Sequence, residues 1–217
     1  MDNVYVSVGG KVFRQVVGIP MGTNCAPFLA NLFLYALEYK YMEKLARRDI
    51  VEARKLSDCF RFIDDLLCLN HGEKLAKAKH EIYPAELCLN RENKTNRAVR
   101  FLDLKMSIEG SRINTALFDK RDEFRFKVNK YPHLSSNVHK KRTHGIVISQ
   151  LMRFAKACMR LPDFVARARE MIKTLMGKAY DIRLIKKKLS TFYDKYYSMV
   201  CNYNVTKKQL FGQIFYQ

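Results

Sequence analysis

The sequence predicts an α+β fold in which a part that mixes strands and helices precedes a smaller, helical part. Three observations predict this order. Before about residue 130, short runs alternate apolar and polar residues between turn-forming segments, which is typical of antiparallel hairpins. After about residue 145, apolar residues recur instead at spacings of three and four, which is typical of helices. Apolar residues form 48% of the 217-residue chain, which is enough for a folded core.

The N-terminal segments predict a hairpin, a loop and a long helix. Residues 4–16 alternate apolar and polar side chains around a Gly-Gly pair, which predicts a hairpin with a two-residue turn. A Gly- and Pro-rich loop over residues 18–27 follows, and Pro27 suits the first turn of a helix that runs to about Leu45. Residues 28–37 are apolar on almost every side of this helix, so we expect them to be buried against a sheet.

The middle of the chain predicts more strands around one helix. Residues 59–70 are typical of a strand, a tight turn and a strand, and residues 72–83 of a helix. We expect a short strand over residues 86–90, before a polar loop. Residues 101–118 alternate again about a Glu-Gly-Ser turn, which predicts a second hairpin.

Helical periodicity dominates the C-terminal end. After a basic loop over residues 132–143, Pro162 and Gly177 separate three predicted helices. The last of them carries apolar residues on one side and cationic residues on the other, so we expect one face to pack and one to be charged. The three helices are expected at 145–160, 162–177 and 181–199.

The charge balance favours a polyanionic partner. The chain has 40 Lys and Arg against 21 Asp and Glu, a net charge of +19, which excludes an ordinary metabolic enzyme and favours nucleic acid or an acidic surface. No apolar run approaches the roughly 18 residues of a membrane span, and no signal peptide is evident, so we expect an intracellular protein without a membrane partner. The six cysteines lack zinc-site and redox-motif spacing, so we expect reduced core thiols.

Asp64 and Asp65 stand side by side at the tip of the hairpin predicted over residues 59–70. Adjacent carboxylates repel each other unless a cation neutralises them, so a bound metal ion is an economical explanation. Because successive residues of a strand face opposite sides, Asp64 is the one that points into such a site. A solvated acidic turn explains the pair about equally well on spacing alone, since aspartates are common in turns.

The order of these motifs resembles that of reverse transcriptases. The stretch GIPMGTNCAPFLANLFL is followed by FRFIDD, LCLNRENKTN, FLDLKM and a basic, Leu- and Phe-rich end. In this order they resemble the reverse transcriptase core of Penelope-like retroelements, which are relatives of telomerase, over nearly the whole chain. The resemblance implies a partial polymerase palm, an antiparallel sheet with packed helices, over residues 1–130. A basic linker over residues 131–144 and a helical thumb-like domain over residues 145–217 complete the implied organisation.

The resemblance also implies an activity and the residues that serve it. The activity is RNA-directed DNA synthesis with Mg²⁺, or Mn²⁺ in its place, held by carboxylates of the palm. Asp64 matches a catalytic metal ligand, and Asp65 matches a catalytic residue that supports it electrostatically. The remaining positions match residues that contact the nucleotide and template (Gly18, Ile19, Pro20, Met21, Gly22), the leaving phosphates (Lys94) and the primer end (Phe101, Leu102, Leu104).

Basic residues concentrate in the helical end, where the thumb of such an enzyme follows the phosphates of a primer and template duplex. A solvated helix face is the alternative, but acids do not compensate this charge, so we expect contact with nucleic acid. The implied partners are an RNA template, a DNA primer or duplex and, in the complete enzyme, a dNTP, and the implied location is the nucleus. The residues expected on the phosphate backbone are Lys140, Lys141, Arg142, Arg153, Lys156, Arg169, Lys173, Lys186, Lys187 and Lys188.

The sequence departs from the family before the Gly-Pro loop. There the family has a fingers subdomain and a strand that ends in a further metal-binding Asp, whereas Asp2 is the only acid before the loop here. We therefore expect the chain to be inactive alone, and its incomplete palm to expose apolar surface that favours self-association. The alternatives are a non-catalytic nucleic-acid-binding remnant of a retroelement, or a sequence that covers only part of a gene.

Overall fold

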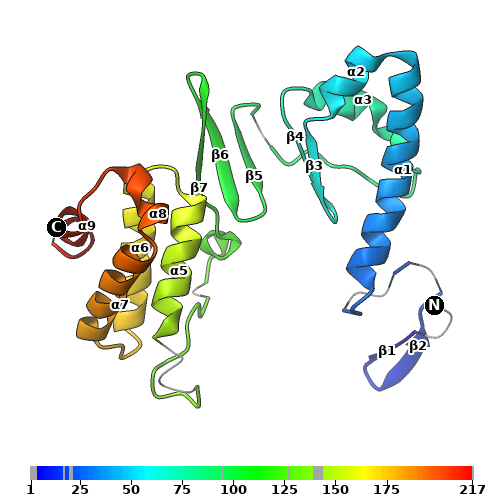
Figure 1. The fold of residues 1–217 in the computed structure, drawn as a ribbon. Helices are drawn as coiled ribbons and strands as arrows, with labels where there is room; N and C mark the ends of the chain where they lie inside the picture. The colour runs from blue at the N-terminus through cyan, green and yellow to red at the C-terminus, as the bar shows by residue number, and fades with distance from the viewer. Residues whose placement is uncertain are drawn as a thin grey trace. The chain divides into compact units, whose positions relative to one another are not determined.

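The computed structural model describes residues 4–16, 18–19, 22–93, 95–126, 128–138 and 144–216. Contacts divide the chain into two compact units, Met1–Glu92 and Asn93–Gln217, which we call the N-terminal and the C-terminal unit. Both combine helices with small antiparallel sheets (Figure 1). The fold is therefore mixed α and β, as the sequence predicts.

The first element is the predicted hairpin. Strands β1 (Tyr5–Val8) and β2 (Lys11–Arg14) pair antiparallel. Gly9 and Gly10 form the turn between them with φ angles of +58° and +77°, which glycine adopts without the steric cost that a Cβ brings. This prediction is confirmed.

Helix α1 (Ala26–Arg48) also begins where the sequence predicts, with Pro27 in its first turn. It ends because Asp49 caps the start of a second helix, α2 (Ile50–Leu56), which is not among the predicted helices. The Asp49 carboxylate accepts hydrogen bonds of 3.0 Å from the backbone N–H groups of Val51 and Glu52.

The prediction that residues 28–37 are buried against a sheet is wrong. Phe28, Leu32 and Phe33 are 81%, 63% and 51% exposed. The sheets described in this unit are two-stranded hairpins, which are too small to cover a long helix on several sides. The core cluster of the unit lies at the other end of α1 and comprises Leu45, Ala53 and Leu56.

The acid pair lies on the predicted hairpin of β3 (Cys59–Phe62) and β4 (Asp65–Cys68). The predicted helix after it is α3 (Gly72–Ile82). The strand predicted over residues 86–90 is wrong, because no neighbouring segment pairs with these described residues and Leu87 N–H instead closes a turn on the carbonyl of Pro84, at 3.0 Å.

The C-terminal unit begins with a three-stranded antiparallel sheet in the order β5 (Ala98–Phe101), β6 (Leu104–Glu109), β7 (Arg112–Leu117). The turn between β6 and β7 is the predicted one. Strand β5 is not among the predicted strands, and Leu102 and Asp103, predicted as strand, form the turn between β5 and β6. Leu102 adopts a φ of +53°. Leucine rarely adopts a positive φ, so the residue type gives no sign of a turn at this position.

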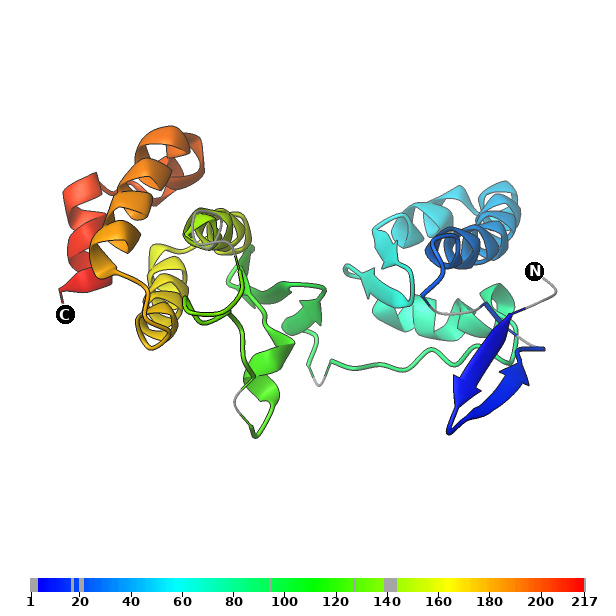
Figure 2. The ribbon, with the colours of Figure 1, turned by 90° about the horizontal axis from the view of Figure 1, so that it is seen from below.

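Helices form the rest of this unit. Helices α5 (Gly145–Ala157), α6 (Leu161–Met176) and α7 (Ile182–Lys195) lie side by side, as Figures 1 and 2 show from two directions. They confirm the three predicted helices. Short elements follow or intervene: a 3-10 turn η1 (Lys120–Glu123), α8 (Tyr197–Val200), a 3-10 turn η2 (Cys201–Tyr203) and α9 (Lys207–Phe215). The fully buried side chains between these elements include Leu151, Phe164, Leu189, Phe192 and Leu210.

The sheet β5–β7 belongs to the same compact unit as the helices. Thr115 Oγ1 on β7 donates a hydrogen bond of 2.8 Å to the carbonyl of Ala157, and Met159 N–H donates to the carbonyl of Thr115 at 2.9 Å. Arg167 on α6 donates to the carbonyl of Leu117 at 3.0 Å. The boundary between the two units therefore lies near residue 92 of the chain, and the palm and thumb assignment with its boundary near residue 130 stays a prediction.

All six cysteines are free thiols, as expected, but most are not in the core. Cys158 is buried, whereas Cys25, Cys88 and Cys201 are exposed. The expectation of core thiols is wrong for these three. Within the described ranges, no helix has the length and apolar character needed to cross a lipid bilayer.

Candidate functional site

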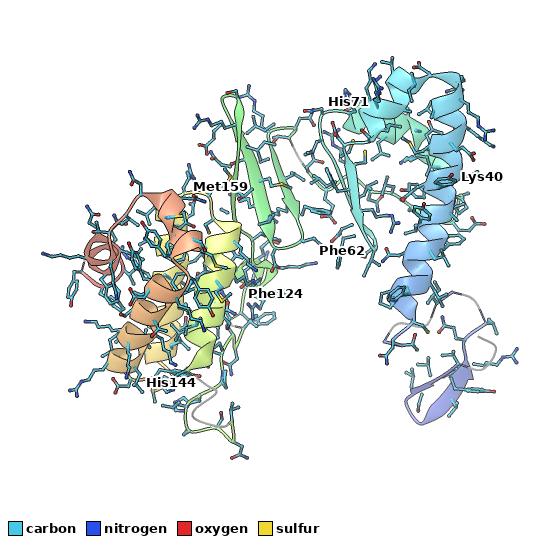
Figure 3. All side chains as sticks on the ribbon, in the orientation of Figure 1. Lys40, Phe62, His71, Phe124, His144 and Met159 are labelled. Atoms are coloured by element: carbon cyan, nitrogen blue, oxygen red, sulfur yellow. The ribbon has the colours of Figure 1, made fainter. Side chains whose placement is uncertain are left out.

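The two adjacent carboxylates lie at the tip of the β3–β4 hairpin, as predicted. Ile63 and Asp64 form the two-residue turn, and Asp65 opens β4 opposite Phe62, which marks the tip in Figure 3. Both carboxylate side chains are exposed. The turn therefore presents them to any ligand that approaches the tip.

The turn carries backbone strain directly before Asp64. Ile63 has a φ of +53°, in the left-handed region that a β-branched residue rarely adopts. Holding a residue there costs about 1 to 2 kcal/mol. Arg61 Nη1 donates a hydrogen bond of 3.4 Å to the carbonyl of Ile63, and this contact helps to offset the cost.

Arg61 joins the hairpin to α1. Its Nε donates a hydrogen bond of 2.7 Å to Oε1 of Glu38, and its Nη1 donates one of 2.7 Å to Oδ1 of Asn31. The hydroxyl of Tyr83, just after α3, donates to the same Glu38 oxygen at 2.7 Å. Burial, and then the Glu38 carboxylate, raise the pKa of Tyr83, so it remains a donor. We call these four residues the Arg61 network.

The Arg61 network brings together two of the motifs on which the resemblance rests. Asn31 belongs to the helix that follows the Gly-Pro loop, and Arg61 precedes the acid pair. Of that loop, Gly18 and Gly22 have φ angles of +88° and +89° and exposed backbone. Ile19 is 36% exposed. Pro20 and Met21 lie outside the described residues.

The described residues do not fit a two-ion centre. In the ranges that the structure covers, no group of three or more His, Cys, Asp or Glu side chains is arranged to hold a metal ion. Mg²⁺ prefers near-octahedral coordination by several oxygens, and two ions need carboxylates from more than one strand. Asp64 and Asp65 supply part of such a donor set.

A second candidate surface lies in the C-terminal unit. A groove of about 560 Å³ runs between the turn before β6 and helix α5. Leu104, a predicted primer-end residue, lines it together with Arg153 and Lys156, two predicted phosphate contacts. Asp103 pairs with Arg153 at 2.8 Å, which leaves Lys156 as the groove's exposed cation without a described acidic partner. Phe101 and Leu102 belong to the β5 end of this turn.

The other predicted phosphate contacts differ in how the fold uses them. Lys187 is exposed and Lys188 half-buried on α7, whereas Lys186 donates a hydrogen bond of 3.1 Å to the Tyr216 hydroxyl and lies over its ring. Arg169 donates to the carbonyl of Gln213, at 2.7 Å from Nε. Lys173 is exposed on α6. Lys94, Lys140, Lys141 and Arg142 lie outside the described residues.

An ion-pair network that the sequence does not reveal ties residues 119–130 to α6. Lys130 Nζ lies 2.5 Å from Asp122 and 2.9 Å from Glu170, and Arg167 lies 2.6 Å from Asp122. Hydrogen bonds from Arg121 lower the pKa of the adjoining Asp119 to about 2. Arg167 therefore uses its charge within the fold.

An exposed aromatic pair that the sequence-based predictions do not include lies after η1. Phe124 and Phe126 stack with ring centroids 5.1 Å apart and are 48% and 67% exposed (Figure 3 labels Phe124). Aromatic residues interleaved with Arg125 are a pattern that single-stranded nucleic acid binders use, and this pattern could have revealed them.

Comparison of the chain with protein-family models, with curated proteins and with solved structures finds no match in any of the three.

Proposed function

We propose that this chain is part of a retroelement reverse transcriptase. In this proposal the N-terminal unit contributes Asp64 and Asp65 to RNA-directed DNA synthesis, and the C-terminal unit holds the duplex of RNA template and DNA primer. The observation that supports it best is the Arg61 network, because it bonds the helix after the Gly-Pro loop to the acid-pair hairpin. A polymerase needs these two motifs close together, since the nucleotide reaches both.

Each part of the proposed site has a physical task. Asp64 and Asp65 present negative charge at an exposed tip, where the incoming dNTP would arrive with its cations. Gly18 and Gly22 allow the backbone to approach the nucleotide and template closely. Leu104 offers an apolar contact beside Lys156, a cation suited to a phosphate. The location proposed for the complete enzyme is the nucleus.

The proposal does not require the chain to be active by itself. In the described residues no third carboxylate joins Asp64 and Asp65. We therefore propose binding of nucleic acid without synthesis for the chain alone, and synthesis in the complete enzyme.

Binding to an RNA–DNA duplex is expected to weaken steeply with salt. Each phosphate neutralised adds roughly 0.9 to the slope of log affinity against log salt concentration. Replacing Lys187 and Lys188 with Gln is expected to lower this slope by up to about 1.8. Fluorescence anisotropy with a labelled duplex, repeated over a salt series, measures it.

A matched variant controls for loss of charge alone. Lys40→Gln with Lys44→Gln removes two exposed lysines from α1, and Lys40 points away from the hairpin in Figure 3. This variant is expected to keep the wild-type slope. Equal slopes for the wild type and the Lys187, Lys188 variant would exclude α7 from the interface.

The second candidate function is a non-catalytic nucleic-acid-binding protein. One observation favours it: the groove and the cationic face of α7 both lie in the C-terminal unit, which has the larger core. Asp64 and Asp65 lie in the N-terminal unit. Binding by this unit can persist without chemistry at Asp64. Primer extension by the chain fused to an upstream palm segment separates the two candidates, because only a reverse transcriptase would then synthesise DNA.

Self-association through α1 is part of the proposal. Phe28, Leu32, Tyr35 and Tyr39 recur at spacings of four, three and four along α1, and each is more than half exposed. Such spacing makes one continuous apolar stripe on a helix, which a second copy of the same helix can cover.

Disruption of this stripe is expected to shift the chain towards monomer. Phe28→Gln with Leu32→Gln should weaken self-association more than about tenfold, because burial of each side chain contributes roughly 1.5 to 3 kcal/mol. Sedimentation equilibrium over a concentration series measures the change. Met176→Gln, at a half-exposed position on α6, is the control, and a variant that associates like the wild type would rule out the α1 stripe.

A further inference from the structure

Cys59 and Cys68 face each other across the acid-pair hairpin. They are direct partners in the register of β3 and β4, at the end of the hairpin remote from Asp64. We call each pair of opposite residues a rung. Leu69 N–H donates to the carbonyl of Asp58 at 3.0 Å, so the next rung outward, Asp58 with Leu69, is a hydrogen-bonded one. Because the two rung types alternate, Cys59 and Cys68 occupy a rung without backbone hydrogen bonds.

This rung type suits a covalent link between the two side chains. Opposite residues at such a rung have Cα atoms about 4.5 Å apart, and a disulfide needs about 4.4 to 6.8 Å. Partners at one rung also project to the same side of the hairpin, so the thiols do not need to rotate through the sheet.

The surroundings hold the pair in place. Cys59 alternates with the exposed Phe60 and so shares the face of Arg61, which bonds to α1. It packs against the cluster of Leu45, Ala53 and Leu56. Burial, and then the nearby Cys68, raise the pKa of Cys59, so Cys59 is the less readily ionised thiol of the pair and reacts second.

We propose that Cys59 and Cys68 form a reversible thiol–disulfide site that locks the base of the acid-pair hairpin. The site goes beyond the proposed polymerase function and does not depend on it. Among the described residues, this is the pair of cysteines that a strand register places opposite each other.

The oxidant is a small-molecule disulfide such as oxidised glutathione. The Cys68 sulfur, as thiolate, attacks one sulfur of glutathione disulfide, and one glutathione leaves as its thiolate and takes up a proton. The Cys59 thiol then loses its proton and its sulfur displaces the second glutathione from Cys68. Two protein thiols become one disulfide, and one glutathione disulfide becomes two reduced glutathiones. Excess reduced glutathione reverses both steps.

The lock would act on the turn that carries Asp64. The bond closes residues 59–68 into a loop that contains Arg61 and the strained Ile63. A cross-link at the base fixes the register of the strands, because a slip by one residue would separate the partners. Oxidation therefore stabilises the hairpin without covering Asp64.

The test is oxidation of the reduced 217-residue chain by oxidised glutathione, followed by intact-mass measurement and peptide mapping. We expect a monomer in which a Cys59–Cys68 cross-link replaces two thiols, while exposed Cys25, Cys88 and Cys201 carry glutathione. Cys59→Ser is expected to trap a glutathione on Cys68, because the second displacement is lost. Cys88→Ser is expected to leave the cross-link unchanged.

A second measurement does not depend on a variant that folds. Hydrogen exchange of the wild-type amides at Phe60 and Leu67 is expected to slow on oxidation and to recover when reduced glutathione is added. Glutathione on both Cys59 and Cys68 of the wild type, or no cross-link under conditions that modify Cys88, would overturn the proposal. Unchanged exchange in the cross-linked chain would refute the lock.

Discussion

The 217-residue chain alone is expected to extend no primer, whereas its fusion to the upstream palm segment of a complete Penelope-like reverse transcriptase is expected to synthesise DNA. Asp64→Asn in the fusion should reduce that synthesis by roughly 10³-fold or more. The reason is the number of carboxylates: the described residues bring no third acid to Asp64 and Asp65, and the added segment supplies one. Primer extension on a homopolymer template, in magnesium and in manganese buffer, measures the activity.

Matched variants make this result specific. Asp58→Asn removes an exposed carboxylate from the far end of the same hairpin and is expected to leave synthesis unchanged. Asp65→Asn should cause a smaller loss than Asp64→Asn. Strong extension by the chain alone would show that no added carboxylate is needed, and a fusion that tolerates Asp64→Asn would leave the binding protein as the better account.

Replacement of Arg61 by Ala is expected to destabilise the β3–β4 hairpin by roughly 2 to 4 kcal/mol. The Arg61 side chain is 14% exposed and that of Glu38 is 26% exposed, so the variant leaves a half-buried carboxylate without its cation. Hydrogen exchange of the hairpin amides in the full chain measures the effect and should speed up by a factor of roughly 30 or more. The helices of the C-terminal unit should be unaffected and provide an internal reference.

An exposed ion pair on α1, the helix that carries Glu38, is the control. Arg47 and Glu43 pair on α1 at 2.6 Å, with Arg47 78% exposed, so Arg47→Ala should cost less than about 0.5 kcal/mol. Tyr83→Phe removes one hydrogen bond to Glu38 and should lie between the two variants. Equal exchange in all three variants would show that the Arg61 network does not hold the hairpin.

Local chemistry explains which elements the sequence could predict. The turn at Gly9 and Gly10, the helix start at Pro27 and the face of α7 each depend on residues close together in the chain. The prediction of a strand over residues 86–90 is wrong because strand-forming residues need a neighbouring strand with which to pair. Helix α9 was missed although Thr206 and Gln209 form a capping box that could have predicted it.

Contacts between distant residues explain what the sequence could not predict in the site. The acid pair at a hairpin tip followed from spacing. The Arg61 network did not, because Asn31, Glu38, Arg61 and Tyr83 come from three separate segments and no periodicity links them. The exposure of Phe28 likewise depends on which sheet packs on α1, a property of the assembled unit rather than of the helix.

The unequal cores of the two units bear on how the chain is made in a cell. The ribosome releases the N-terminal unit first, and its core cluster contains only Leu45, Ala53 and Leu56 among the described residues, whereas twenty buried side chains form that of the C-terminal unit. A nascent segment with an uncovered apolar helix attracts chaperones and aggregates readily. Proteases would cut the N-terminal unit of an unassembled chain first. The abundance of the chain in the cell would therefore follow the supply of the partner that covers α1.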